Sequence, residues 1–445
     1  MFSKILIANR GEIAVRVIRA CKEMGIATVA VYSTADADAL HVHFADEAYC
    51  VGPAPARQSY LNMGAILSAA TVSGAQAVHP GYGLLSENAR FAALCQQCGI
   101  AFIGPSPEIL RKMGDKDEAR RTMKAAGVPL IPGTDVLATA QDAQNAARDI
   151  GFPLLIKARA GGGGRGIRRV DAPDGVEKAF LTASAEAQAA FGDGSVYIEK
   201  LLQRVKHIET QILADSHGNV VILGERDCSV QRNNQKLIEE SPSVCVNEST
   251  RAALFDVSRR AAQAVGYQGA GTVEFLLDGD GNFYFMEMNT RLQVEHPVTE
   301  MVSGVDIVKW QIRVAAGLPL DFGQDDIALS GHSIECRINA EDPANGFKPC
   351  GGTITTLHVP GGPWVRFDTA AYQDYTVPPF YDSLVGKLVV HAKTRGECIR
   401  KMKAALCELV IEGIEHTASL QYELLDRKEF TDGSYTTKFL EERVK

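Results

Sequence analysis

The sequence predicts an α/β protein of several domains that begins with a parallel sheet, and three observations support this fold class. The chain has 445 residues, too many for one compact core, so we expect two to four domains. Its hydrophobic content of 46% and charged content of 22% are ordinary for a globular protein. The first hundred or so residues alternate short apolar runs with segments of helical periodicity, which is typical of βαβ units.

The N-terminal elements follow one another closely. Residues 4–8 (KILIA) predict a strand and Asn9-Arg10-Gly11 a turn. Apolar residues then recur at helical spacing from Ile13 to Met24, and residues 27–32 (ATVAVY) predict the next strand. Because the first turn reads NRGE and not GxGxxG, it supports a dinucleotide site only weakly.

Charge and hydropathy exclude some classes of protein. A formal net charge of -8 argues against nucleic acid as the main partner, because binding a phosphate backbone needs a basic surface. No run is long and apolar enough to span a bilayer, and the N-terminus lacks a leader pattern, so we expect a cytoplasmic protein. The pair Cys95 and Cys98 has no second pair at zinc spacing, so we expect plain thiols.

A glycine-rich segment is the first feature that indicates chemistry. Residues 153–157 (PLLIK) predict a strand that ends in Lys157, and the chain resumes at 167–170 (IRRV) after ARAGGGGRG. Four consecutive glycines cannot form a stable element, so we expect a mobile loop whose N–H groups can wrap phosphate oxygens. A flexible hairpin tip is the alternative. A P-loop is excluded because GK[ST] is missing.

A pair of carboxylates on a predicted hairpin is the second such feature. Strands 271–278 and 283–289 flank the turn residues GDGN. Pairing Asp278 with Phe283 puts Glu274 opposite Glu287, with Cβ atoms about 5 Å apart. The opposite face would then be apolar, formed by Val273, Phe275, Leu277, Tyr284, Met286 and Met288. Two facing carboxylates predict a Mg²⁺ site, and two solvated surface glutamates are the alternative.

The alternation of side chains between the two faces of the second strand continues beyond residue 289 if the chain stays extended. Asn289, Arg291, Gln293 and Glu295 would then share the face of Glu287, beside the metal. His296, on the other parity, is expected to be structural.

With these features in place, the chain resembles the ATP-grasp fold and, within it, biotin carboxylase. Six motifs run in order along almost the whole chain: KILIANRGEIA at the start, HPGYG…SEN at 79–88, MGDK ending at Lys116, EMNTRLQVEHPVTE at 287–300, ECRINAED at 335–342 and YDSLVGKL at 381–388. The resemblance implies a Rossmann-like N-terminal domain (1–113), an ATP-grasp domain (114–330) with a mobile glycine-rich lid at about 131–203, and a C-terminal mixed α+β domain (331–445).

The resemblance also assigns roles to single residues. ATP is expected to contact Lys116, Lys157, Gly163, Gly164, Arg165, Gly166, Glu199, Lys200, Leu202, His207, Gln231, Asn234, Glu274 and Glu287. Two Mg²⁺ or Mn²⁺ ions are expected on Glu274, Glu287 and Asn289. Bicarbonate is expected among Lys236, Arg291, Gln293, Val294 and Glu295. In this assignment Glu295 is the general base, Arg337 binds the ureido oxygen of biotin, and Tyr82 and Asp382 lie nearby; the catalytic set is Glu295, Arg337, Arg291 and Lys236.

The implied activity is ATP-dependent carboxylation of biotin on a carrier protein, the first half-reaction of acetyl-CoA carboxylase in fatty-acid synthesis. Bicarbonate would be activated as carboxyphosphate. Met402-Lys403 lies in a predicted helix and does not resemble a biotin-accepting turn, so we expect a separate carrier protein and separate carboxyltransferase subunits. Arg16, Arg19 and Glu23 resemble the family's homodimer contact. No nucleic acid and no membrane is expected as a partner.

Two departures from the family pattern keep alternatives open. Asn234 stands where the family usually has a histidine near the nucleotide, and the lid opens with Arg159-Ala160 where Ser-Gly is usual. We therefore expect altered ATP binding with the catalytic positions intact. Three alternative functions remain. They are another ATP-grasp ligase, for example of carbamoyl-phosphate type, a noncatalytic scaffold of a carboxylase complex, and a Rossmann dehydrogenase.

Overall fold

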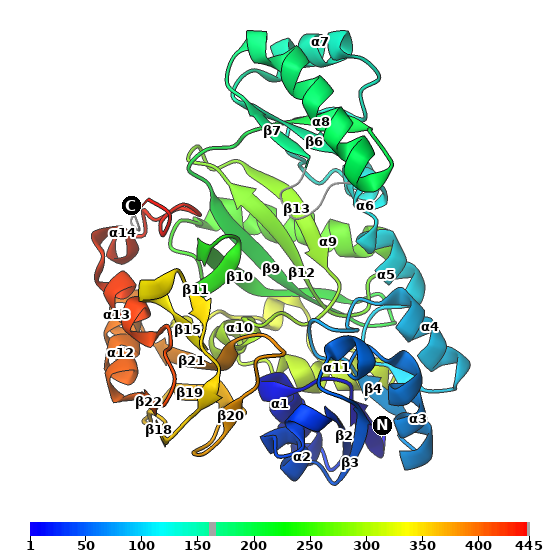
Figure 1. The fold of residues 1–445 in the computed structure, drawn as a ribbon, viewed down its shortest axis with the longest axis vertical. Coiled ribbons are helices and arrows are strands. Elements are labelled where there is room, and N and C mark those ends of the chain that lie inside the picture. Colours follow the sequence, from blue (N-terminus) through cyan, green and yellow to red (C-terminus); the bar gives the residue numbers. More distant parts are fainter. Residues whose placement is uncertain (160–165, 443–445) are drawn as a thin grey trace. The chain divides into compact units, whose positions relative to one another are not determined.

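The computed structural model describes residues 1–159 and 166–442, which form two compact units. The large unit contains residues 1–128, 206–275 and 287 onward, and the small unit contains residues 129–205 and 276–286. Figure 1 shows the elements of both units along the chain. Among the described residues, no helix combines the length and the apolar character that a membrane crossing requires.

The large unit begins with a five-stranded parallel sheet in the order β3-β2-β1-β4-β5. This confirms the predicted fold class of the N-terminal region. Its strands are β1 (Lys4–Ile7), β2 (Ala27–Ser33), β3 (Glu47–Gly52), β4 (Ala77–His79) and β5 (Ala101–Phe102). The helices of this region are α1 (Gly11–Glu23), α2 (Leu40–Phe44), α3 (Met63–Ser73), α4 (Ala89–Gln97), α5 (Pro107–Gly114) and α6 (Lys116–Ala125).

An eight-stranded sheet in the order β13-β12-β9-β10-β11-β14-β21-β19 is the second sheet of the protein. Its strands are β9 (Lys206–Ala214), β10 (Val220–Arg232), β11 (Gln235–Ser241), β12 (Gly269–Leu277), β13 (Phe283–Asn289), β14 (His332–Asn339), β19 (Val365–Thr369) and β21 (Leu384–Ala392). The accompanying helices are α9 (Glu248–Val265), α10 (His296–Ser303), α11 (Ile307–Ala315), α12 (Arg395–Glu408), α13 (Ala418–Asp426) and α14 (Lys428–Thr431). Three two-stranded ribbons complete the region: β15 (Glu341–Asp342) with β16 (Lys348–Pro349), β17 (Gly352–Thr353) with β20 (Thr376–Val377), and β18 (Thr356–His358) with β22 (Val410–Glu412).

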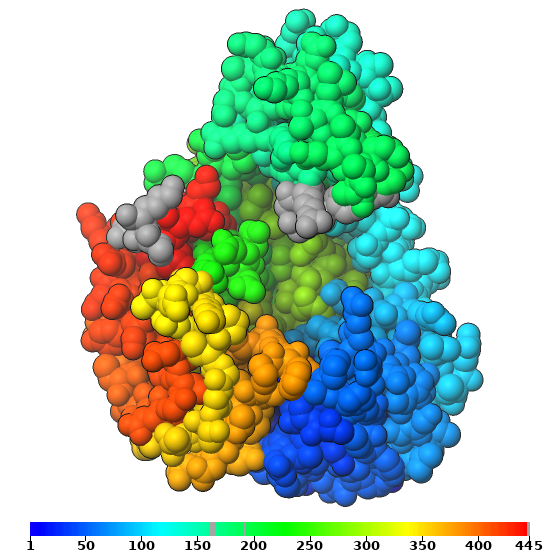
Figure 2. Space-filling model, in the orientation of Figure 1, coloured from blue at the N-terminus to red at the C-terminus, as the bar shows by residue number. Residues whose placement is uncertain are grey.

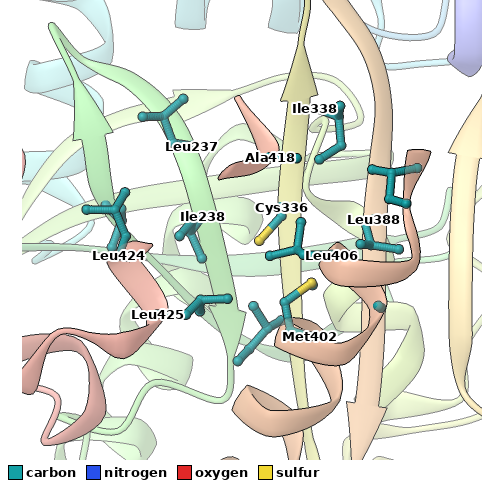
Figure 3. Packing of buried hydrophobic residues seen from close by; sticks show 14 of the residues in the cluster. Leu237, Ile238, Cys336, Ile338, Leu388, Met402, Leu406, Ala418, Leu424 and Leu425 are labelled. Carbon is teal, nitrogen blue, oxygen red and sulfur yellow. The ribbon is translucent and has the colours of Figure 1, made fainter. Parts of the chain in front are cut away.

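The C-terminal part of this sheet separates apolar and ionic side chains onto its two faces. Ile238, Cys336 and Leu388 are aligned across β11, β14 and β21, and they pack with Met402 and Leu406 of α12 (Figure 3). Side chains alternate along a strand, so the neighbouring Glu239, Arg337 and Lys387 belong to the opposite face. An apolar layer therefore supports one side of the sheet and leaves the other side to polar groups.

A β-bulge in β11 interrupts this alternation. Val230 pairs with Ile238, whereas the next residue of β10, Gln231, pairs with Lys236, so Leu237 is an extra residue in β11. Both Leu237 and Ile238 consequently lie in the apolar core. The bulge lets Lys236 and Glu239, three residues apart, serve the same polar face, and bulges commonly redirect side chains next to active sites.

The turn between β10 and β11 explains one of the two departures from the family pattern. Asn233 and Asn234 both have positive φ, 48° and 65°. A two-residue hairpin loop with both central residues at positive φ is a type I′ turn, for which asparagine is among the preferred residues. Asn234 thus has a conformational role in addition to any contact with a ligand.

Residues 372–381 pack against the N-terminal region inside the large unit. The Tyr381 hydroxyl lies 2.5 Å from the Ser33 hydroxyl, and the Tyr372 hydroxyl donates to the Asp38 carbonyl at 2.6 Å. Figure 2 shows the same packing, with the C-terminal segment in orange directly against the N-terminal segment in dark blue. Residues more than 300 positions apart thus form one structural body.

The small unit contains a three-stranded sheet in the order β7-β6-β8, with β6 (Leu154–Ala158), β7 (Ile167–Val170) and β8 (Val196–Lys200). Helices α7 (Ala140–Ile150) and α8 (Val176–Phe191) supply its apolar core together with the sheet. The predicted strand–loop–strand order around the glycine-rich segment is confirmed by β6 and β7. The predicted ATP residues Gly163, Gly164 and Arg165 lie outside the described residues.

The predicted apolar face of the β12–β13 hairpin is wrong for β13. Met286 is 40% exposed, whereas Phe285, expected on the other face, is 2% exposed. The N–H of Phe285 donates to the Pro129 carbonyl at 2.8 Å, and Leu130 forms a parallel bridge with Phe285. This added pairing within the small unit surrounds Phe285 with protein, and the sequence of the hairpin alone gives no sign of it.

We expect Glu240 to make the stability of the large unit sensitive to acid. Its buried carboxylate accepts hydrogen bonds from His332 (2.7 Å), Arg395 (2.7 Å) and Tyr435 (2.5 Å). Burial alone would raise its pKa, but His332 and Arg395 outweigh burial and lower the pKa of Glu240 from 4.5 to about 2. A pKa depressed on folding stabilises the fold above the ordinary value, here by about 3 kcal/mol, and this contribution disappears as the pH falls toward 2.

Glu240→Gln is therefore expected to lower the thermal midpoint by several degrees at pH 7, and by less than half as much at pH 3. Thermal unfolding followed by circular dichroism at both pH values measures the difference. Glu412→Gln, at an exposed position of β22, is the control and should change neither midpoint. A Glu240→Gln deficit that is equal at both pH values would contradict the linkage.

Candidate active site

The centre of the polar face is the carboxylate of Glu295, which is fully buried at the start of α10. One of its oxygens lies 2.6 Å from the Lys236 ammonium and the other 2.9 Å from the Arg337 guanidinium. Burial would raise the pKa of Glu295, but the charges of Lys236 and Arg337 lower it below its ordinary value. Glu295 is thus an ionised carboxylate that can accept a proton at neutral pH.

Lys236 is shared by three carboxylates. Its ammonium lies 2.6 Å from Glu295, 2.7 Å from Glu209 and 3.1 Å from Glu274. Burial favours the neutral amine, but the surrounding negative charges raise the pKa of Lys236 well above its ordinary value. An anion entering the site would find a cation that is already held in place.

The predicted metal residues Glu274, Glu287 and Asn289 are partly brought together. Glu274 accepts from the Asn289 and Gln293 amides, both at 2.9 Å, and lies 2.9 Å from His207. Glu287 projects from β13, and loss of hydration together with the negative charge of Glu274 raises its pKa. Two carboxylates and an amide oxygen are the donors that a hard cation such as Mg²⁺ prefers, and a cation would relieve the repulsion between the carboxylates. The donor set therefore fits Mg²⁺.

A second possible donor set, His207, Glu209 and Glu274, has ligand atoms within 4.8 Å of one another. Glu209 and Glu274 both already bind Lys236, and a cation there would meet that ammonium. Glu274, Glu287 and Asn289 therefore stay the predicted metal residues.

The prediction that residues 289–295 continue as an extended strand is wrong. Strand β13 ends at Asn289, and the chain turns before α10 begins at His296. The predicted side chains still meet, because the Arg291 guanidinium donates to Asn289 (3.1 Å) and Gln293 (2.8 Å), and Gln293 donates to Glu274. Hydrogen bonds from long side chains bring these residues together in place of strand parity.

Glu87 fixes this turn and was not among the predicted site residues. Its carboxylate accepts from the Thr290 N–H and hydroxyl (2.9 and 3.0 Å) and from the Arg291 guanidinium (2.9 Å). Glu87 lies in the SEN motif, and its place in one of the six motifs that run in order along the chain was the sign of a role. The N-terminal region thus holds the segment that carries Arg291.

Arg337 bridges two acids. In addition to Glu295, it donates to Glu239 at 2.6 Å. Burial raises the pKa of Glu239 to about 7 although Arg337 opposes this. The neighbouring strand residue Glu335 is also buried, and burial raises its pKa well above 4.5. Arg337 is therefore shared between Glu239 and Glu295, and both carboxylates raise its pKa against the effect of burial.

Arg226 lies beneath the site and was also missed. It is fully buried and donates to Glu209 (2.5 Å), Gln211 (2.7 Å) and Thr299 (2.9 Å). Arg226 thus holds Glu209, one of the three partners of Lys236. The run Glu225-Arg226-Asp227 was the available signal, since three adjacent charges are rare in a buried strand such as β10.

The predicted ATP residues are divided between the two units. In the small unit, Lys157 of β6 forms an ion pair with Glu199 of β8, and Gly166 precedes β7 with φ of 73°. A Cβ at Gly166 would lie 2.7 Å from the Cβ of Ala158, so only glycine fits. Lys200 and Leu202 lie at and beyond the end of β8, and Lys116, His207, Gln231 and Asn234 belong to the large unit. Contact of both groups with one nucleotide stays a prediction.

The predicted dimer residues differ in exposure. Arg16 is buried and donates to Glu300 (2.9 Å) and Asp306 (2.7 Å) of its own chain. Arg19 is exposed, and Glu23 lies 2.5 Å from Lys309. Arg16 thus has a structural role within the chain, and Arg19 and Glu23 are the residues of this set that a second chain could reach.

Three family profiles cover almost the whole sequence. "Biotin carboxylase, N-terminal domain" matches residues 1–110, "Carbamoyl-phosphate synthase L chain, ATP binding domain" matches residues 115–322, and "Biotin carboxylase C-terminal domain" matches residues 335–442.

Individual relatives agree with these profiles over their full length. The chain is 55% identical to "Biotin carboxylase" of Nostoc sp. over 445 residues, covering all of both chains. Its structure is similar to a biotin carboxylase–ATP complex from Campylobacter jejuni, with a TM-score of 0.93, 51% identity and coverage of 100% and 99%. It is also similar to the biotin carboxylase domain dimer of Hydrogenobacter thermophilus 2-oxoglutarate carboxylase, solved with ADP, magnesium and bicarbonate (TM-score 0.92, 50% identity, coverage of 100% and 98%).

Proposed function

The chain belongs to the biotin carboxylase family and is an ATP-dependent ligase that carboxylates biotin, and we propose that it does so on a carrier protein by way of carboxyphosphate. The observation that carries this proposal is the buried Glu295 carboxylate between Lys236 and Arg337. An ionised base and two fixed cations in one enclosed place suit the activation of a small anion.

In the proposed first step, Glu295 takes the proton of bicarbonate, and a bicarbonate oxygen attacks the γ-phosphorus of ATP, which releases ADP. Lys236 and Arg291 hold the anion, and Gln293 and the Val294 backbone complete its surroundings. Mg²⁺ or Mn²⁺, held by Glu274, Glu287 and Asn289, would neutralise charge on the phosphates. The lysines Lys116 and Lys157 are proposed to contact the same phosphates.

In the proposed second step, carboxyphosphate breaks down to CO₂ and phosphate. The phosphate removes the N1′ proton of biotin, and the nitrogen then attacks CO₂. Negative charge develops on the ureido oxygen, where Arg337 stabilises it, with Tyr82 beside the ring. Water would hydrolyse carboxyphosphate, so the glycine-rich segment is proposed to exclude water when ATP is bound.

The proposed partners are a biotin carboxyl carrier protein, carboxyltransferase subunits and a second copy of this chain. The dimer described for the Hydrogenobacter relative supports a homodimer, with Arg19 and Glu23 as candidate contacts. Acetyl-CoA carboxylation for fatty-acid synthesis in the cytoplasm is the proposed setting. The same relative belongs to a 2-oxoglutarate carboxylase, so the biotin carboxylase fold does not by itself determine which molecule receives the carboxyl group.

ATP hydrolysis by the purified chain tests the proposed function. The assay measures ADP release with Mg²⁺, with and without bicarbonate and free biotin. Hydrolysis that requires bicarbonate and rises with biotin is the expected result. Bicarbonate-dependent hydrolysis that ignores biotin at every concentration would favour another ATP-grasp ligase, and ATP binding without hydrolysis would favour a noncatalytic scaffold.

We expect Asn234→His to lower the KM for ATP and to leave kcat unchanged. Histidine tolerates the positive φ of this position better than most residues, so the turn should survive the change. One additional hydrogen bond to the nucleotide is worth about 1 kcal/mol, or roughly a five-fold lower KM. Asn233→His, at the neighbouring exposed position of the same turn, is the matched control. An unchanged KM for ATP would show that the asparagine serves the turn alone.

A further inference from the structure

Lys387 is a fully buried cation that the proposed mechanism leaves unused. It lies in the middle of β21, and its side chain is 0% exposed. Its ammonium lies 3.1 Å from the Glu12 carboxylate and donates to the Val294 carbonyl at 2.9 Å. A buried ammonium is costly unless it is paired, and the Glu12 carboxylate and the Val294 carbonyl both lie beside the site described above.

The first partner connects Lys387 to the biotin side of the site. Glu12, in the first turn of α1, is 5% exposed and also accepts a hydrogen bond from the Tyr82 hydroxyl. Asn9 donates to the Pro80 carbonyl at 2.7 Å and to the Tyr82 carbonyl at 2.8 Å. Hydrogen bonds thus join the NRGE and HPGYG motifs, and Lys387 contacts both motifs through the carboxylate of Glu12.

The second partner connects Lys387 to the bicarbonate side. Val294 and Glu295 lie between β13 and α10, outside both elements. The Val294 carbonyl belongs to the peptide group that immediately precedes Glu295, so holding this oxygen fixes the direction in which the Glu295 side chain leaves the backbone. Val294 itself is one of the predicted neighbours of bicarbonate.

We propose that Lys387 is a positioning residue. It fixes the Val294–Glu295 peptide directly and the Tyr82 loop through Glu12, so that the general base stays aligned with the biotin site. This inference rests on the proposed function, because it assigns to Lys387 an action through Glu295. Reacting groups need near-contact alignment, and a misplacement of about 1 Å can cost about 100-fold in rate.

Other charges near Lys387 do not replace it. Asp368 is held by Arg366, which donates to both of its oxygens at 2.9 and 2.7 Å. His296 binds the Gln293 carbonyl through Nδ1 at 2.8 Å, and burial lowers its pKa well below 6.5, so it is neutral. Among the described residues, Lys387 is therefore the cation that donates to the Val294 carbonyl.

Lys387→Met tests the proposal by removing the ammonium and keeping most of the side-chain volume. We expect kcat for bicarbonate-dependent ATP hydrolysis to fall by about 10- to 100-fold, with the KM for ATP unchanged. In a Glu295→Gln background the same substitution should have little further effect, since both changes act on the base. Lys401→Met is the matched control, because Lys401 donates to the His391 carbonyl of the same strand at 2.8 Å, away from the site.

The double variant Glu12→Gln/Lys387→Met separates positioning from charge balance in the core. It removes both members of the ion pair, so it should fold even where Lys387→Met alone is unstable. We expect its thermal midpoint to approach that of the unmodified protein while kcat stays low. Recovery of kcat in the double variant would overturn the positioning role. So would a loss of kcat from Lys387→Met that is equally large in the unmodified protein and in the Glu295→Gln background.

The two proposals fail in different ways. If the unmodified protein hydrolyses ATP with bicarbonate and biotin and Lys387→Met does so equally fast, the positioning role is overturned and the proposed function stands. If the unmodified protein shows no bicarbonate-dependent hydrolysis, the proposed function is overturned, and the role of Lys387 falls with it.

Discussion

Replacing Glu295 by glutamine is expected to lower bicarbonate-dependent ATP turnover by about 10²- to 10⁴-fold, the range in which a general base contributes. Glutamine keeps the shape of the side chain and can accept from either Lys236 or Arg337 through its one oxygen, but it cannot take a proton. The low pKa of the native carboxylate, set by Lys236 and then Arg337 against the effect of burial, keeps it in the proton-accepting form at neutral pH.

Initial rates of ADP release at saturating ATP and bicarbonate measure this loss, and calorimetric titration with MgADP checks that nucleotide still binds. Glu335→Gln is the matched control, since Glu335 is a buried glutamate on the strand of Arg337 whose side-chain oxygens accept no hydrogen bond from the described residues. That control should retain near-normal turnover. Retention of turnover by Glu295→Gln would show that bicarbonate loses its proton to another group.

Replacing Arg337 by methionine is expected to abolish the stimulation of ATP hydrolysis by biotin, with a loss of about 10²- to 10³-fold in the biotin-dependent rate. The guanidinium is the group proposed to stabilise charge on the ureido oxygen. It also lies 2.9 Å from Glu295 and lowers the pKa of that carboxylate. Its removal should raise the pKa of Glu295. Because a protonated base is inactive, a higher pKa means that activity is lost at a higher pH as the solution is acidified. The acid limb of the remaining bicarbonate-dependent rate should therefore move to higher pH.

The measurement is a pH–rate profile of ADP release with and without biotin. Arg395→Met removes another buried arginine that binds a glutamate, Glu240, at 2.7 Å, and it serves as the control for general loss of stability. It should keep both the biotin stimulation and the position of the acid limb. Undiminished stimulation by biotin in Arg337→Met would exclude the assigned role.

The sequence predicted those features that depend on local pattern. Alternating apolar segments gave the N-terminal parallel sheet, and the run of glycines between two strands was correctly placed between β6 and β7. The resemblance to biotin carboxylase is confirmed by profiles and relatives over the full length of the chain. The domain boundaries and the individual site roles stay predictions.

The features that sequence reasoning missed depend on contacts between distant segments. Lys387 and Glu12 are 375 positions apart and meet only because β21 packs against α1. Strand parity failed after Asn289, because the chain turns there and Glu87 stabilises the turn. The bulge in β11 also has no local signal, since no residue type in Gln235–Ser241 indicates that Leu237 is an unpaired insertion.

That unpaired residue has a consequence for how the protein can evolve. Unbroken alternation over Lys236, Leu237 and Ile238 would place Lys236 on the apolar face with Ile238, and the bulge at Leu237 is what leaves Lys236 on the polar face with its three carboxylates. Deleting Leu237 would restore regular pairing with Lys236 still on the polar face, at the cost of one buried apolar side chain. The length of this strand can thus change by one residue across descendants without moving Lys236, provided that Leu237 is the residue that is lost.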